Sequence, residues 1–162
     1  MIEKELNRAI NLRKNGNYDK SNSLLMKLVE NNPDNASINY QYALNFDVLG
    51  EEQKAVIYYE KAIKLGLAPQ DLEKAFLGLG STYRTLGHYK QSKDTFLKGI
   101  ELFPNNRAFL TFYSMTLYNL NEYSEAMELL LKCLIETTTD DNILDYKKAI
   151  TFYSDKLDEI WS

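Results

Sequence analysis

A short turn signal recurs along the chain at a nearly constant interval, and this repeat limits the possible folds more than any other feature. The signal begins with Gly or Asn at Gly16, Gly50, Gly87 and Asn121. Successive positions are 34, 37 and 34 residues apart. A fixed period of this length indicates an array of similar units, each of which buries its apolar face against its neighbours.

The spacing of apolar residues between these signals is helical. In the third unit Phe76, Leu79, Gly80 and Tyr83 fall on one stripe, with intervals of three, one and three residues. Equivalent stripes occur in the second and fourth units. Each unit is therefore predicted to be two short helices joined by a tight turn at Gly or Asn, the residues that tolerate positive φ. Small residues on the stripes should let the two helices approach closely.

The third unit, from Phe76 through Gly87, Tyr89 and Phe96 to Pro104, resembles the tetratricopeptide repeat (TPR) family. It carries the family's sequence of aromatic, Leu-Gly, Tyr, Phe and Pro, although Ser92 and Gly99 stand where alanine is favoured. The signature covers roughly residues 2–136, and the segment 65–72 also resembles small bacterial TPR proteins without assigned activity.

The resemblance implies an all-α fold, a right-handed TPR superhelix (α-solenoid) of four helix-turn-helix hairpins plus a capping helix. We expect a single domain over residues 1–162, with repeats at about 2–34, 35–69, 70–105 and 106–138. The three-residue excess between units two and three lies in 65–72, where we expect a longer loop and a slightly extended following helix.

The last segment predicts one amphipathic helix over about 141–161, which would be the ninth helix. Its apolar residues recur at intervals of 3, 4, 3, 4 and 3: Ile143, Tyr146, Ile150, Tyr153, Leu157 and Ile160. Terminal repeats need a cover for their apolar face, so a capping role is favoured. Self-association or partner binding through the same stripe is the alternative.

Composition and charge exclude several classes of function. The net charge is −4 with both signs interspersed, so we expect no nucleic-acid partner. No apolar run is long enough to span a membrane, and the first residues have no signal-peptide pattern. The single cysteine, Cys133, fits a reducing compartment. We therefore expect a cytoplasmic protein.

No set of residues indicates catalysis, a cofactor or a metal. His88 is the only histidine and lies in a turn, while Cys133 occupies a packing position. The segment 78–82, Gly-Leu-Gly-Ser-Thr, lacks the preceding strand and the Gly-Lys-Ser/Thr of a phosphate loop. The expectation is a protein that is not an enzyme.

In the TPR family the first helices of successive units line a concave groove, so the resemblance implies a binding site on the stripe opposite their packing stripe. The candidate groove residues are Arg13, Tyr40, Leu44, Asp47, Lys74, Leu77, Arg84, Phe112, Met115 and Tyr118. The predicted groove is basic, about +2 on a chain of −4, and aromatic. We expect a protein or peptide ligand, in an extended or helical segment that carries apolar and acidic residues. One class of TPR proteins binds the C-termini of chaperones through Lys, Asn and Arg residues of the groove. This sequence matches only one of those residues, a lysine, so we do not expect a chaperone partner.

Two alternatives to this adaptor function remain open. One is a structural unit that assembles with itself through the C-terminal stripe, so that the chain could be a monomer or a homodimer. The other is a non-catalytic regulatory or recruiting subunit of an enzyme complex.

Overall fold

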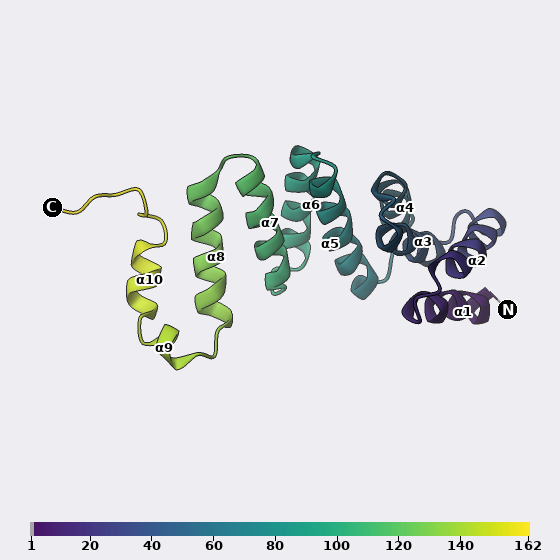
Figure 1. Ribbon diagram of the computed structural model, residues 1–162, viewed down its shortest axis with the longest axis horizontal. Coiled ribbons are helices and arrows are strands. Elements are labelled where there is room, and N and C mark those ends of the chain that lie inside the picture. Colours follow the sequence, from purple (N-terminus) through teal and green to yellow (C-terminus); the bar gives the residue numbers. More distant parts are fainter. Residues whose placement is uncertain (1) are drawn as a thin grey trace. The chain divides into compact units, whose positions relative to one another are not determined.

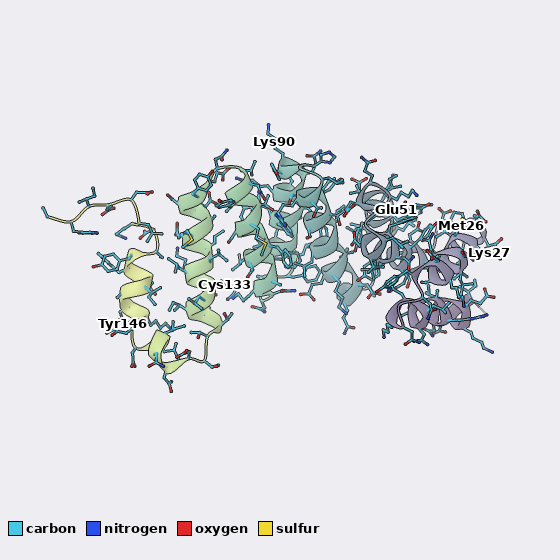
Figure 2. All side chains as sticks on the ribbon, in the orientation of Figure 1. Met26, Lys27, Glu51, Lys90, Cys133 and Tyr146 are labelled. Atoms are coloured by element: carbon cyan, nitrogen blue, oxygen red, sulfur yellow. The ribbon has the colours of Figure 1, made fainter. Side chains whose placement is uncertain are left out.

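The computed structural model describes residues 2–162, which form helices joined by turns and loops, without a strand (Figure 1). The expected all-α class is confirmed. In chain order the helices are Ile2–Lys14 (α1), Tyr18–Asn31 (α2), Ala36–Leu49 (α3), Glu52–Leu65 (α4), Pro69–Thr85 (α5), Tyr89–Leu102 (α6), Arg107–Asn119 (α7), Tyr123–Thr137 (α8), Asp141–Leu144 (α9) and Lys147–Tyr153 (α10).

The described residues form two compact units. The N-terminal unit runs to His88 and contains α1 to α5, and the C-terminal unit begins at Tyr89 and contains α6 to α10. Each unit is described by itself below. Hairpins in a repeat array pack only on their neighbours, so such a chain needs no single enclosing core. The single domain expected over 1–162 stays a prediction.

The four predicted turns share one geometry, which explains the period of the sequence. Gly16, Gly50, Gly87 and Asn121 all have positive φ, at 76°, 70°, 76° and 64°. The residue after each of them donates its backbone N–H to the carbonyl five positions earlier, at 2.8–2.9 Å. This is the closing hydrogen bond of a helix that ends in a left-handed residue. Only glycine and, less often, asparagine adopt that conformation cheaply, so the turn signal recurs.

The three-residue excess between the second and third repeats lies in the following helix, as expected, but the expected longer loop is wrong. The loop from α4 to α5 is residues 66–68, which is shorter than the loops 32–35 and 103–106 between the other repeats. α4 ends at Leu65, and α5 starts at Pro69, which occupies the first turn of the helix. Proline is tolerated there because its missing N–H would have no partner within the helix. α5 has 17 residues, against 13 to 15 for the other helices of the repeats.

Small side chains bring the helices of the N-terminal unit together. Ala43 and Ala55 are fully buried, on α3 and α4, and these two helices pack against each other. Beside them the ring centroid of Tyr42 lies 4.4 Å from that of Phe46 and 4.6 Å from that of Tyr58. Large rings thus fill the space next to the alanine contacts, as close packing requires.

The C-terminal unit uses different residues for the same purpose. Phe96 and Phe109 are fully buried, and Gly99 of α6 lies against the Phe109 ring of α7. Ser92 and Thr116 place their buried hydroxyl oxygens 2.9 Å apart. Ser92 and Gly99 replace the alanine that the TPR pattern favours. Ser92 forms a hydrogen bond with Thr116, and Gly99 leaves room for the ring of Phe109.

The expected single helix over about 141–161 is replaced by two short ones, α9 and α10, after which the chain continues without a helix from Ser154 (Figure 1). The described residues therefore contain ten helices and not nine. The stripe that predicted the helix stays largely in solvent: Tyr146 is 67% exposed and Ile160 98%. A short helix is marginal without buried apolar contacts, so the periodicity alone does not hold a longer one together.

The contact between Gly99 and Phe109 gives the first testable prediction. A Cβ added at residue 99 would lie 2.1 Å from Cε1 of Phe109, far inside van der Waals contact. Gly99→Ala should therefore lower the free energy of unfolding by about 1–3 kcal/mol, measured by urea denaturation. The neighbouring exposed substitution Lys98→Ala should change it by less than about 0.5 kcal/mol. Equal stability of the two variants would contradict the packing described here.

Candidate ligand-binding face

Asp47 joins three helices of the N-terminal unit. It lies in the last turn of α3, where Tyr59 of α4 donates its hydroxyl to Oδ2. Thr82 of α5 has its Oγ1 at 3.0 Å from Oδ1 of the same carboxylate, and at 2.8 Å from the Gly78 carbonyl. Tyr59 and Thr82 are buried and Asp47 is half-buried. One carboxylate thus connects α3, α4 and α5 through side chains.

Gly78 makes room for this contact. A Cβ at residue 78 would lie 2.5 Å from the Tyr59 hydroxyl oxygen and 2.7 Å from the ring carbon that bears it. The tyrosine therefore reaches Asp47 along a path that any other residue at 78 would obstruct. This gives the first glycine of the Gly-Leu-Gly segment a packing role.

Burial dominates the electrostatics of this cluster. It raises the pKa of the Asp47 carboxyl above its usual range, although the hydrogen bonds from Tyr59 and Thr82 act in the opposite direction. Burial, followed by the nearby Asp47, also raises the pKa of Tyr59. Tyr59 therefore remains a protonated donor under ordinary conditions.

A second polar contact connects α1 to α3. Arg13 donates from Nη1 to the backbone carbonyl of Gln41 at 2.9 Å, and from Nη2 to the Gln41 side-chain oxygen at 2.5 Å. Burial lowers the pKa of the Arg13 guanidinium. An arginine nevertheless keeps its charge in proteins. The two contacts fix the guanidinium in one orientation.

These contacts arrange the first helices of the N-terminal unit side by side, α1 against α3 and α3 against α5. We call their shared surface the first-helix face. We define it by six of the residues predicted from sequence, which lie on these three helices: Arg13, Leu44, Asp47, Lys74, Leu77 and Arg84. Lys74 is exposed and the other five are half-buried.

Tyr40 was expected to be an aromatic anchor for a ligand, and the structure places it elsewhere. It is only 3% exposed, and its ring centroid lies 6.2 Å from that of Tyr59. Burial raises its pKa to about 12, with a smaller contribution from Asp71. Tyr40 therefore belongs to the core beneath the first-helix face.

The three remaining predicted residues lie on α7 of the C-terminal unit. Phe112 is half-buried, with its ring stacked on Phe96 at 6.2 Å. Met115 and Tyr118 are 40% and 63% exposed. The ring of Tyr118 contacts that of Tyr123, with centroids 5.0 Å apart. Met115 and Tyr118 are thus accessible, and Phe112 is largely part of the packing.

Sequence reasoning missed Tyr59 and Thr82. Tyr59 occupies the position at which the other repeats have Leu25, Phe96 and Leu130, so the repeat pattern indicates only a packing role for it. Its hydroxyl was the available signal, because a buried tyrosine usually needs a hydrogen-bond partner. The partner lies 12 residues away on another helix, and the spacing within one helix does not reveal it.

Within residues 2–162 no three His, Cys, Asp or Glu side chains are grouped in a way that could hold a metal ion. Cys133 is buried, as expected from its packing position. None of the helices in this range is both long and apolar enough to cross a membrane.

Comparison with known proteins identifies repeats along most of the chain. The family model described as "Tetratrico peptide repeat" matches residues 36–157, and a second model, "Tetratricopeptide repeat", matches residues 5–35. Among curated proteins, Superkiller protein 3 of Saccharomyces cerevisiae is 28% identical over 92 residues, which are 57% of this chain and 6% of that protein.

The solved structures that share this fold include those of MamA and YrrB. MamA is 20% identical with a TM-score of 0.74, over 89% of this chain and 78% of its own. YrrB, a TPR protein with an unusual peptide-binding site, is 19% identical with a TM-score of 0.72, over 94% and 77%. Similarities at this level of identity support the fold.

The burial of Asp47 predicts how stability depends on pH. Its raised pKa means that the folded state holds the proton more tightly than the unfolded chain does. The contribution of Asp47 to stability should therefore increase as pH falls from neutral and decrease as the carboxyl ionises. Each pKa unit between the two states corresponds to about 1.4 kcal/mol.

We expect the unfolding free energy of the wild type to rise relative to that of Asp47→Asn as the pH is lowered. Denaturant titrations of both proteins over a range of pH measure this difference. Asp34→Asn removes the same charge from an exposed turn and serves as control. A difference that falls on acidification would mean that the hydrogen bonds to Asp47 outweigh its burial.

Proposed function

This chain belongs to the tetratricopeptide repeat family, and we propose that it is a non-catalytic protein-interaction module. The proposed site is the first-helix face of the N-terminal unit. The proposed ligand is an extended or helical segment of a partner protein that carries both apolar and acidic residues.

The observation that carries the proposal is the pair of contacts across the first helices. Arg13 on Gln41 joins α1 to α3, and Thr82 on Asp47 joins α3 to α5. A surface held by such contacts before binding loses little conformational freedom when a ligand arrives. The core beneath it, with Tyr40 and Tyr59, supports the same arrangement.

Apolar side chains on this face supply a source of affinity. Leu44 of α3 and Leu77 of α5 are half-buried, and Val48 of α3 is 49% exposed. Each would lose further contact with water under a bound apolar side chain, at about 25 cal/mol for each Å² removed.

Charge on the face favours acidic residues in the ligand. Lys74 is exposed and Arg84 is half-buried on α5, and Lys14 is exposed at the end of α1, beside Arg13. The one carboxylate among the six residues of the face, Asp47, already accepts two hydrogen bonds. Basic groups on a chain of net charge −4 would orient an acidic segment and speed its association.

The peptide-binding site of YrrB makes a peptide a reasonable class of ligand, although the similarity of the two chains concerns the fold. The exposed Met115 and Tyr118 of α7 are a second proposed contact surface, in the C-terminal unit. A recruiting subunit of an enzyme complex would use the same surfaces. The cytoplasmic location stays a prediction.

Charge reversal on the first-helix face tests the proposal. The probes are two fluorescent peptide sets with equal leucine and phenylalanine content, one with Asp and Glu at the remaining positions and one with Lys and Arg. Fluorescence anisotropy should show that wild type prefers the acidic set. Lys14→Glu/Lys74→Glu should weaken that binding roughly tenfold, because Lys74 is exposed on the face and Lys14 is exposed next to Arg13 in the sequence.

The matched control is Lys27→Glu/Lys64→Glu, which makes the same change in net charge on exposed positions of α2 and α4. It should bind the acidic set nearly as wild type does. Equal weakening by both double variants would show that net charge, not this face, governs binding. Equal binding of the two peptide sets to wild type would contradict an acidic ligand.

A further inference from the structure

The C-terminal arm, residues 146–161, presents a cluster of aromatic rings to solvent. The ring centroid of Phe152 lies 5.1 Å from that of Tyr153 and 5.8 Å from that of Trp161. These three residues are 50%, 47% and 57% exposed. Leu157 and Ile160 add exposures of 50% and 98%. Contiguous apolar surface of this kind is unusual on a monomer and typical of an interaction site.

The arm is held in place on the C-terminal unit. α10 packs against α8. Beyond α10, the Ser124 hydroxyl of α8 donates to Oδ2 of Asp158 at 2.5 Å. Lys156 donates from Nζ to the Phe152 carbonyl at 3.1 Å, and Ser154 is only 1% exposed. The ring cluster is therefore a positioned surface.

The exposed charges differ in sign between the beginning and the end of the arm. Lys147 and Lys148 begin α10, and Tyr153 ends it. Glu159 follows six residues after Tyr153, in the segment without a helix. Both lysines and Glu159 are exposed. None of the three forms an ion pair within residues 2–162.

Overall the arm is electrically balanced. Its three lysines, at 147, 148 and 156, are matched by three carboxylates, at 155, 158 and 159. Two copies of the arm therefore have no net repulsion to overcome. A parallel arrangement would place like charges together, whereas an antiparallel one places the basic start of each arm beside the acidic end of the other.

We propose that the C-terminal arm is a docking surface for a second copy of this chain, in an antiparallel pair about a two-fold axis near Tyr153. The same patch then serves on both subunits, as in most homodimers. Lys147 and Lys148 of each copy face Glu159 of the other, and the aromatic rings pack at the centre. Covering these side chains on both copies would bury on the order of 1,000 Å², where specific interfaces begin.

Sedimentation velocity over a range of protein concentrations, up to about 500 µM, tests the pairing, because interfaces at the small end of the size range form weak, transient complexes. Wild type should pass from monomer to dimer. Trp161→Ala should raise the dimer dissociation constant about tenfold, since buried aromatics contribute strongly to interfaces. Glu159→Lys alone and Lys147→Glu/Lys148→Glu alone should each raise it at least about fivefold, by placing like charges together.

Mixing the two charge variants gives the most specific result. In a mixed dimer, each copy meets the opposite charge again on both sides of the axis, so an equimolar mixture should dimerise about as well as wild type. All variants change exposed side chains, and circular dichroism should confirm equal helix content. A monomeric wild type at the highest concentration, or a mixture no better than its components, would overturn the proposal.

Discussion

The hydrogen bond from Tyr59 to Asp47 is the interaction on which the organisation of the N-terminal unit depends. Tyr59 lies on α4, the second helix of its repeat, and its hydroxyl reaches the Asp47 carboxylate on α3, the first helix of the same repeat. Thr82 adds α5 to the same carboxylate, and Gly78 leaves the path open. The buried alanines let α3 and α4 approach closely. In this account the hydrogen bonds to Asp47 set the register of α3, α4 and α5.

The hydrogen bonds to Asp47 also affect the charge of the proposed binding surface. The carboxylate that would otherwise repel an acidic ligand already accepts two hydrogen bonds within the protein. Arg13 is fixed by Gln41, and Lys74 remains exposed on the adjacent helix. In the proposal, basic groups on the same helices as half-buried leucines suit a ligand that is both apolar and acidic.

The repeat architecture could be read from the sequence because each turn must satisfy one local requirement, a left-handed residue after a helix. Gly16 and Asn121 reveal that requirement directly. The site was less predictable: Tyr40 lies on the correct stripe yet is buried by Tyr59, a contact between two helices that no spacing within one helix encodes. The prediction of a single C-terminal helix was wrong for a related reason. A periodic pattern of apolar residues shows which face could be buried, but it does not supply a partner that buries that face.

A double-mutant cycle between Tyr59 and Asp47 tests the central contact most directly. Tyr59→Phe removes the donor hydroxyl, and Asp47→Ala removes the carboxylate that accepts from it. Losses that each substitution causes outside this contact cancel in the cycle. We predict, from urea denaturation, that Tyr59→Phe destabilises the wild type by at least about 1 kcal/mol more than it destabilises Asp47→Ala. Additive effects, within about 0.5 kcal/mol, would contradict a register set by this hydrogen bond.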